Sequence, residues 1–469
     1  MKKSICNKNT NIKNVLSYIN EDPAGIAFIV NDDNKLCGLI TDGDIRRMLI
    51  DGRSLEDDLL ENDYNNYEYA TEDQSIEELI KEVDKKVRII PIVSNEGYLI
   101  DYFRYEHKTH FTPVAEPKLN GNELKYVTDA ILSTWISSKG SYLDRFEHEF
   151  AEFCETKYGI ATSNGTVSIH LALKALGIGK GDEVIVPDLT FAATINPVLL
   201  AGATPVIVDI DPINWTICPQ KIQKAITKKT KAIIPVHVYG QPCDMENIMD
   251  IAEKFKLFVI EDCAEAHGAT FKNKKVGSFG HISTFSFFGN KIITTGEGGM
   301  CVTNSKDLYN KMRILRDHGM DPNKRYWHKE IGYNYRMTNV QAAIGCAQLE
   351  KINSIIQQHK SIEEFYKKKL KGVKELIWQK QTQNSKSVVW LVSLLTPAKK
   401  RDIIIEQLQK RNIDARRFFY CLSEMPLYSV YAKDCKTSKE ISSKGINLPT
   451  VENLDYNLIS SIIIDCINS

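Results

Sequence analysis

The stretch Leu257-Phe-Val-Ile-Glu-Asp-Cys-Ala-Glu-Ala-His-Gly268 is the most informative part of this 469-residue chain. An apolar run there leads directly into two adjacent acids, Glu261 and Asp262. Carboxylates at the end of a buried strand are costly to desolvate unless they have partners. The pattern therefore favours one of two structures. One is a structural ion pair or helix cap, and the other is a carboxylate that stabilises the protonated ring nitrogen of a bound molecule.

Strands of the same kind recur on both sides of this stretch. Seven short runs are rich in β-branched or aromatic residues, at residues 158–162, 183–187, 204–209, 231–238, 257–260, 284–288 and 299–303. Helical patterns lie between most of them, at residues 167–176, 191–200, 219–226 and 245–256. Apolar strands that alternate with helices predict an α/β fold with a mainly parallel sheet covered on both faces. Ligands of such sheets bind at the carboxyl ends of the strands, so a site is expected in these loops.

Two further strand ends carry residues suited to chemistry. Ser163-Asn-Gly-Thr166 joins a strand to a helix, where free backbone N–H groups and the helix dipole suit a phosphate dianion, although Ser163 or Thr166 could equally be a helix N-cap. Lys291 follows an aromatic strand and precedes a glycine-rich turn. Apolar surroundings favour the free amine that a Schiff base requires, although most lysines are solvated surface charges. A phosphate loop, an acid and a lysine, in this order on successive strands, form the set that pyridoxal phosphate needs.

Composition and charge argue against several other classes of protein. Lys+Arg and Asp+Glu both number 60, so the zero formal net charge gives no reason to expect nucleic acid or an anionic membrane surface as a partner. No apolar stretch of signal-peptide or membrane-spanning length occurs. The 11 Cys residues are scattered without a Cys-x-x-Cys pair. This spacing disfavours a zinc ribbon or a disulfide framework, and it predicts reduced thiols in a cytoplasmic protein without a metal site.

The uneven distribution of charge indicates an added N-terminal module. Residues 1–110 carry 14 Lys+Arg against 22 Asp+Glu, and the polar segment 105–117 contains two prolines. Past residue 350 the pattern becomes more helical and more charged. We therefore expect an N-terminal module at residues 1–108, a linker at 109–118, a large domain at 119–350 and a small C-terminal domain at 351–469.

The N-terminal module contains a short repeat. Residues 26–40 and 88–100 both have a strand–turn–strand pattern, and amphipathic helices follow residue 41 and span residues 76–83. This α+β repeat resembles a CBS pair, a regulatory module in which the Thr and Asp of a Gly-x-x-Thr-x-x-Asp pattern hold a nucleotide ribose. Gly38, Thr41 and Asp44 match that pattern once, so the resemblance implies a regulatory nucleotide at Thr41 and Asp44. The alternative is that Thr41 only caps a helix while Asp44 complements its dipole.

Residues from about 112 to 469 resemble the DegT/DnrJ/EryC1/StrS family of sugar aminotransferases, which are fold-type-I pyridoxal-phosphate enzymes. The motifs that carry the resemblance are Trp135-Ile-Ser-Ser-Lys-Gly140, Ser163-Asn-Gly-Thr166, Pro187-Asp-Leu-Thr-Phe-Ala-Ala-Thr194, Glu261-Asp-Cys-Ala-Glu-Ala-His-Gly268, Ser286-Phe-Phe-Gly-Asn-Lys291, Tyr333-Asn-Tyr-Arg-Met-Thr-Asn339 and Arg416-Arg-Phe-Phe-Tyr420. The Ser286–Lys291 motif is similar in particular to the GDP-perosamine branch of the family. The resemblance implies a seven-stranded sheet, a small C-terminal domain and a homodimer with shared active sites.

The resemblance also implies a role for individual residues. Lys291 would hold pyridoxal phosphate covalently, and Asp262 would keep its pyridine nitrogen protonated. Phe191 would stack on the ring, and Glu265 would lie near the ring hydroxyl, where many relatives have Gln. The residues implied to bind the phosphate are Gly165, Thr166, Ser286 and, from the neighbouring subunit, Asn334. For Phe288 we expect plain core packing.

The reaction implied by the resemblance moves the amino group of glutamate to C4 of a nucleotide-linked 4-keto-6-deoxyhexose, for polysaccharide biosynthesis. Cys421 and Ser423 depart from the Pro and His usual in the sugar-binding region, so the identity of the sugar is left open. One alternative is a dehydratase of the same fold, but such relatives replace the lysine with His, whereas Lys291 is present. Another is a non-catalytic, nucleotide-sensing CBS protein, which would be expected to have a degenerate cofactor site.

Overall fold

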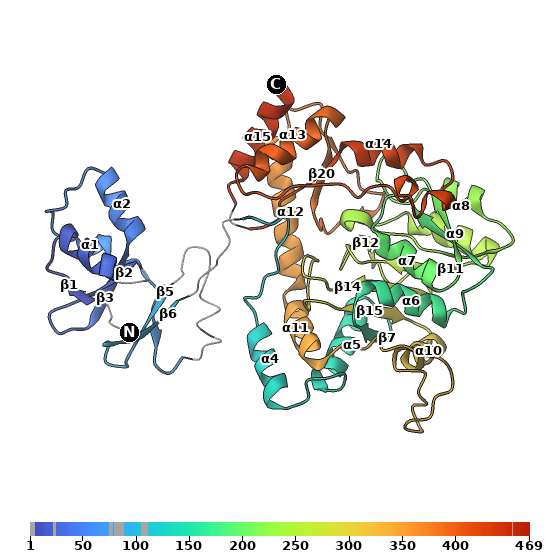
Figure 1. Ribbon diagram of the computed structural model, residues 1–469, viewed down its shortest axis with the longest axis horizontal. Helices are drawn as coiled ribbons and strands as arrows, with labels where there is room; N and C mark the ends of the chain where they lie inside the picture. The colour runs from blue at the N-terminus through green and yellow to red at the C-terminus, as the bar shows by residue number, and fades with distance from the viewer. Residues whose placement is uncertain (1–4, 22–24, 75–77, 79–88, 105–110, 453) are drawn as a thin grey trace. The chain divides into compact units, whose positions relative to one another are not determined.

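The computed structural model describes residues 5–21, 25–74, 78, 89–104, 111–452 and 454–469. The chain divides into two compact units, residues 1–108 and 109–469 (Figure 1). No helix within the described ranges is long and apolar enough to cross a membrane.

The first unit contains the same arrangement of strands twice. One sheet has the order β1-β2-β3 and the other β4-β5-β6, and in each the first pair is parallel and the second antiparallel. The repeat predicted from the sequence is therefore present in both sheets. Apart from residue 78, the helix expected at residues 76–83 lies outside the described residues. The elements of this unit are β1 (Ile5–Asn7), α1 (Ile12–Glu21), β2 (Ile26–Val30), β3 (Leu36–Thr41), α2 (Asp42–Ile50), β4 (Ala70–Thr71), β5 (Ile89–Val93) and β6 (Leu99–Arg104).

Part of the segment expected as a linker packs against the C-terminal end of the chain. The Thr112 N–H donates to the Asn412 carbonyl at 2.7 Å, and the Val114 carbonyl accepts from the Thr450 N–H at 2.8 Å. Val114 is fully buried. These contacts make residues 112–114 part of the second unit.

The second unit is built on a seven-stranded sheet in the order β7-β15-β14-β11-β10-β8-β9. β15 is antiparallel to both of its neighbours, and all other pairs are parallel. The prediction of a mainly parallel α/β sheet is therefore confirmed. The strands are β7 (Tyr158–Thr162), β8 (Glu183–Pro187), β9 (Thr204–Val208), β10 (Thr230–Ile233), β11 (Phe258–Asp262), β14 (Ile282–Ser286) and β15 (Gly299–Thr303).

Four expected strands have different bounds in the structure. β9 ends one residue earlier than expected, and β11 spans Phe258–Asp262 rather than 257–260. The run expected at 231–238 ends as a strand at Ile233, because Pro235 has no N–H to donate to a ladder. The run expected at 284–288 is β14, which begins and ends two residues earlier.

Helices cover both faces of this sheet, because its residues alternate between two apolar cores. One core joins Ile160, Ile260 and Ile282 to α6 (Gly165–Ala175), α7 (Ala192–Leu200) and α10 (Lys306–Arg316). On the opposite face, Val259 packs with α8 (Pro219–Ala225) and α9 (Met245–Phe255). Ala161 and Phe285 pack there with α5 (Ser141–Phe153) and α11 (Asn339–Glu350). α4 (Glu123–Leu132) lies against α11.

After α11 the chain forms a four-stranded antiparallel sheet with helices against it, shown in orange and red in Figure 1. Its strand order is β16-β18-β20-β19. The separate core of this region contains residues of α12, α13 and α15. The elements are α12 (Ile352–Lys369), β16 (Ile377–Trp378), β18 (Val392–Leu395), α13 (Ala398–Gln409), β19 (Arg416–Arg417), α14 (Lys436–Lys444), β20 (Gly445–Leu448) and α15 (Tyr456–Asn468). A further small sheet joins β12 (Thr270–Phe271), β13 (Lys274–Lys275) and β17 (Ser385–Lys386).

Candidate active site

The two adjacent acids at the end of β11 point to opposite faces of the sheet and have different surroundings. Asp262 lies on the face covered by α7, where its carboxylate accepts from the Thr194 hydroxyl at 2.8 Å and from the Ala264 N–H at 3.2 Å. Burial raises the pKa of Asp262, although these two donors and the charge of Lys291 oppose the shift. Asp262 is therefore a buried carboxylate that would gain from a positively charged partner.

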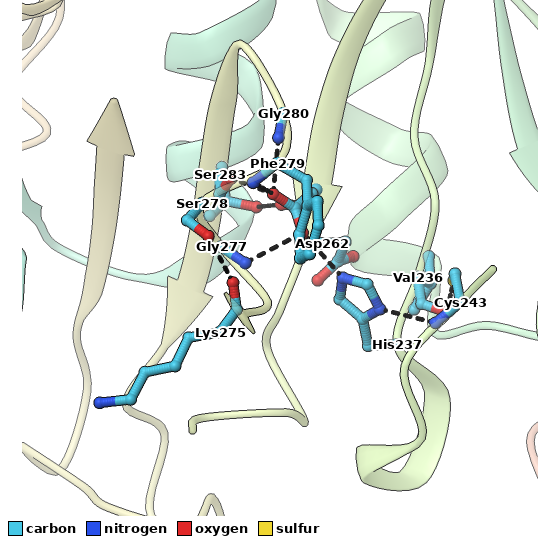
Figure 2. A network of polar contacts seen from close by, with 12 residues as sticks. Val236, His237, Cys243, Asp262, Lys275, Gly277, Ser278, Phe279, Gly280 and Ser283 are labelled. Carbon is cyan, nitrogen blue, oxygen red and sulfur yellow. Dashed lines mark hydrogen bonds and ion pairs between the residues drawn. The ribbon is translucent and has the colours of Figure 1, made fainter. Parts of the chain in front are cut away.

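Glu261 lies on the other face and joins the loop at residues 277–280 to His237. Figure 2 shows that loop and His237 with their hydrogen bonds. The Glu261 oxygens accept from the N–H groups of Gly277, Phe279 and Gly280, and from the Ser283 hydroxyl, at 2.7–2.9 Å. His237 Nε2 donates at 3.2 Å, since its Nδ1 accepts the Cys243 N–H. Although burial opposes ionisation of Glu261, these hydrogen bonds and His237 lower its pKa overall. Of the two roles that the sequence left open for these acids, Glu261 has the role of a structural ion pair.

The same network contains a possible set of metal ligands. Ligand atoms of His237, Glu261 and Cys263 lie within 4.8 Å of one another. Both Glu261 oxygens already accept hydrogen bonds, and burial raises the pKa of the Cys263 thiol well above its usual value. A protonated thiol and an occupied carboxylate are poor ligands, so the arrangement does not favour a metal ion.

Lys291 follows β14 in a turn and faces the same region as Asp262. Its side chain is only 12 % exposed, and its Nζ lies 3.6 Å from Glu265 Oε1. The other Glu265 oxygen accepts the Tyr239 N–H at 2.7 Å. Burial raises the pKa of Glu265, while Lys291 and the Tyr239 N–H oppose the shift. The structure thus brings Lys291, Asp262 and Glu265 together, as the sequence predicted for a lysine and an acid on neighbouring strands.

The loop after β7 forms the N-terminus of α6 beside Ser286. Asn164 is the N-cap, and its side chain accepts the Val167 N–H at 3.0 Å. Neither Ser163 nor Thr166, the two candidates from the sequence, has that role. A Cβ added at Gly165 would lie 2.8 Å from the Ser286 Cβ, so glycine permits this close approach. The N–H groups of Gly165 and Thr166 precede the first helical hydrogen bond, and they point toward a place where an anion would be stabilised.

Three other predicted residues lie at or near the surface. Phe191 precedes α7 and is 59 % exposed, with its ring 5.8 Å from that of Phe419. Asn334 is exposed, and its backbone pairs with Asp317. Phe288 is 47 % exposed, so the expectation that it packs in the core is wrong. The aromatic residues that fill the core at this strand end are Phe285 and Phe287, because Phe288 begins the turn that carries Lys291.

In the first unit, Thr41 and Asp44 bind each other. Thr41 is the N-cap of α2, and its N–H and hydroxyl donate to the Asp44 carboxylate at 2.8 and 2.6 Å. The Asp44 N–H donates to the Thr41 hydroxyl at 3.3 Å, which completes a capping box. The other Asp44 oxygen accepts from Arg47. The geometry is that of the cap alternative considered from the sequence.

Comparison with known proteins agrees with the geometry of the second unit. The DegT/DnrJ/EryC1/StrS aminotransferase family model matches residues 117–466, which is most of the chain. The chain belongs to this family. The CBS domain model matches residues 3–51 of this DegT-family aminotransferase, which correspond to the first repeat of the N-terminal unit.

Individual relatives cover the same part of the DegT-family chain. Three GDP-perosamine synthases are 44–48 % identical to it. The one from Escherichia coli O157:H7 is 48 % identical over 345 residues, or 73 % of this chain and 94 % of the relative. Among solved structures, the aminotransferase from Psychrobacter cryohalolentis has 33 % identity and a TM-score of 0.70, covering 76 % of this chain and 100 % of that one.

The cofactor of this aminotransferase is pyridoxal phosphate, as is typical of the family. Spr1654 from Streptococcus pneumoniae, described as a putative sugar aminotransferase, is known in PLP and PMP forms. It is 26 % identical, with TM-scores of 0.71 and 0.72 and coverage of 76 % of this chain and 97–98 % of its own. The residues present here fit the cofactor: a buried carboxylate suits a pyridinium, a shielded lysine suits an aldehyde, and the N-terminus of α6 suits a phosphate.

Sequence reasoning missed several residues that shape this site. Thr194 orients Asp262, Tyr239 orients Glu265, and the Trp390 ring lies 3.9 Å from Lys291 Nζ. Thr194 is within a quoted motif and could have been inferred from it. Tyr239 and Trp390 stand in ordinary apolar runs, and Trp390 lies about 100 residues from Lys291 in the expected C-terminal domain, so no sequence signal marks them.

Proposed function

We propose that this chain transfers the amino group of glutamate to the C4 keto group of a GDP-linked 4-keto-6-deoxyhexose, as a GDP-perosamine synthase does. The observation that carries the proposal is the meeting of Lys291, Asp262 and the N-terminus of α6 at one edge of the sheet, in a chain of this family. The GDP-perosamine synthases among its relatives support the choice of the nucleotide sugar.

Lys291 and Asp262 have complementary roles in this proposal. When bound, pyridoxal phosphate withdraws electrons from the carbon that loses its proton. Lys291 would hold the cofactor through its amine and, once released, would take a proton from the α-carbon of the amino donor and pass it to the cofactor. Asp262, oriented by Thr194, keeps a positive charge on the ring nitrogen. Glutamate leaves as 2-oxoglutarate and the keto sugar becomes an amino sugar, so the exchange needs no external oxidant.

The remaining predicted residues bind and orient the cofactor. Gly165, Thr166 and Ser286 hold the phosphate, since two unpaired N–H groups and a hydroxyl meet there. Phe191 would stack on the cofactor ring, and Glu265 would contact the ring hydroxyl. Because one Glu265 oxygen accepts the Tyr239 N–H, the Glu265 carboxylate has a defined position.

A homodimer completes the site in this proposal. Asn334 is exposed, which suits a residue that reaches the phosphate of a neighbouring subunit. Exposed aromatic and aliphatic side chains in the preceding hairpin, Tyr326, Trp327 and Ile331, provide apolar surface for such a contact. The 11 free thiols support a cytoplasmic location.

A regulatory nucleotide at the N-terminal unit is a separate proposal, and it rests on the CBS match. Because Thr41 and Asp44 already bind each other, a nucleotide ribose would have to replace the Asp44 contact with the Thr41 hydroxyl. Titrating ATP, AMP and GDP into the full-length protein by calorimetry tests it. Heat that is absent from all three titrations would refute it, whereas binding lost in T41A would support it.

The main experiment offers glutamate with GDP-, UDP- and dTDP-linked 4-keto-6-deoxy sugars and follows the amino product by mass. We expect an amino sugar from the GDP substrate and none from the K291A variant. A deoxygenated product without nitrogen would indicate the dehydratase alternative. A protein that binds no cofactor and transforms no sugar would indicate the nucleotide-sensing alternative.

A further inference from the structure

Two groups from distant parts of the chain lie directly beside the amine of Lys291. Its Nζ lies 3.6 Å from Glu265 Oε1 and 3.9 Å from the centre of the Trp390 ring. A cation above an indole face is attracted by the negative face of the ring, and the attraction is stronger where water is excluded. Trp390 is only 4 % exposed. An ammonium group at this position is therefore stabilised by an acid on one side and an aromatic ring on the other.

The Trp390 indole is held in place from several directions. Its ring N–H donates to the Asn290 carbonyl at 2.6 Å, directly before Lys291 in the chain. Its backbone N–H donates to the Tyr239 carbonyl at 3.2 Å, and its ring is stacked with that of Tyr239, with an interplanar angle of 16°. The ring face beneath Lys291 therefore has a defined position.

Tyr239 connects the two neighbours of the lysine amine. Its N–H donates to Glu265 while its carbonyl accepts from Trp390. Both Tyr239 and Val389, the residue before Trp390, have left-handed backbones, with φ of 56° and 55°. For a bulky or β-branched residue such a φ is strained, and it persists where the surroundings impose it, commonly at functional sites. Here the two strained residues, Tyr239 and Val389, lie where their loops meet, and the hydrogen bonds of Tyr239 hold Glu265 and Trp390 beside the Lys291 amine.

We propose that Trp390 is a positioning residue for transamination, whose indole face receives the Lys291 amine whenever it is not bonded to the cofactor. This inference rests on the proposed function. The freed amine must stay close to the cofactor, move a proton and later bond again, and a resting place beside Glu265 keeps it within reach. Asp262 and His267 are the other titratable groups that face the amine. Burial and the charge of Lys291 lower the pKa of His267 to about 3, so His267 stays neutral.

The proposal predicts a change in an equilibrium. Glutamate converts the lysine-bonded form of the cofactor into the amino form, in which Lys291 is free, and the two forms differ in visible absorbance. If the indole stabilises the free ammonium, its removal shifts this equilibrium toward the lysine-bonded form. A partly desolvated cation–π contact of about 1–2 kcal/mol corresponds to a shift of about 5- to 30-fold.

The experiment compares W390F and W390L with wild type, titrating each holoenzyme with glutamate and 2-oxoglutarate in the absence of sugar. Both variants lose the N–H bond to Asn290, but only W390F keeps an aromatic face. We expect W390F to stay within about threefold of wild type and W390L to shift by about 5- to 30-fold. The matched control is W378L, since the Trp378 ring lies 5.5 Å from Lys367 Nζ in a similar cation–aromatic pair remote from the site. It should leave the equilibrium unchanged.

A second measurement changes the electrostatics of the indole while keeping its shape, so it tests the proposal even if W390L does not fold. Wild type and W390F are both produced with fluorinated tryptophan, which weakens the negative face of every indole ring. The equilibrium should shift toward the lysine-bonded form by about twofold or more in labelled wild type, and stay unchanged in labelled W390F, which has no indole at this position.

The outcomes separate this inference from the proposed function. Equal equilibria in W390F and W390L, or in labelled and unlabelled wild type, would overturn the role of Trp390 while leaving transamination intact. A wild-type protein whose cofactor absorbance does not respond to glutamate would instead overturn the proposed function.

Discussion

Replacing Asp262 by Asn tests two effects of the Asp262 charge separately: its contribution to kcat and its effect on the stability of the cofactor-free protein. The Asn side chain has the same shape. Its oxygen can accept the Ala264 N–H, and its NH2 can donate to Thr194, whose hydroxyl can turn toward Thr190 at 2.8 Å. No hydrogen bond is lost, but the ring nitrogen of the cofactor loses its anionic partner. We expect kcat to fall by at least about 100-fold, as when a single electrostatic contact to a reacting group is removed.

The same change should not harm the cofactor-free protein. Burial raises the pKa of Asp262, so an ionised carboxylate at this position opposes folding until a cation neutralises it. Asn removes the charge, and we expect the cofactor-free D262N protein to gain about 1 kcal/mol, or about 1–2 °C in Tm for a unit of this size. Because the folded-state pKa is raised, the penalty shrinks as pH falls below that value and is gone below the unfolded-state pKa of about 3.9. The difference between variant and wild type should therefore be largest near pH 7 and shrink toward pH 4.

Three measurements check this prediction. Visible absorbance reports whether D262N still bonds the cofactor through Lys291, single-turnover kinetics with glutamate report the chemical step, and thermal melts of cofactor-free protein at several pH values report stability. Thr190→Val, which changes a neighbouring hydroxyl without removing a charge, serves as a control that should leave the pH dependence unchanged. Near-normal turnover in D262N, or a cofactor-free variant that is less stable than wild type at neutral pH, would refute the reasoning.

Three further predictions concern other parts of the chain. Glu261→Gln places an NH2 group among five donors, so we expect a loss of about 3 kcal/mol in the free energy of unfolding by urea. The folded-state pKa of Glu261 is lowered, so the difference in unfolding free energy between wild type and Glu261→Gln should decrease as pH falls below about 4. A difference that does not depend on pH would contradict this. Mixing inactive K291A and N334A subunits should restore about a quarter of wild-type activity if Asn334 serves the neighbouring subunit, because half of the dimers are then mixed and each mixed dimer has one intact site. No recovery of activity would show that Asn334 serves the active site of its own subunit. Thr41→Ala should lower the unfolding free energy of the N-terminal unit by about 1 kcal/mol, detectable as faster amide exchange in α2, and T41S should restore it.

The sequence predicted most of the architecture because the sheet depends on local patterns. Runs such as 183–187 and 204–209 are largely apolar and stand between helical patterns, which leaves few alternatives to a buried, mainly parallel sheet. The bounds were less predictable. β10 ends at Ile233 because of Pro235, and the turn after β14 begins early enough to expose Phe288, although its sequence is that of a core strand.

The sequence alone also predicted that Lys291, Asp262 and the Ser163–Thr166 loop share one site, because the carboxyl ends of parallel strands lie at the same edge of a sheet. It could not distinguish the roles of two adjacent acids. Glu261 and Asp262 differ only in the face of the sheet to which each points, and only the packing of the 277–280 loop against one face makes Glu261 structural. The place of Trp390 beside Lys291 was likewise decided by the tertiary structure, because a contact between residues 99 positions apart depends on tertiary packing and leaves no periodic signal in the chain.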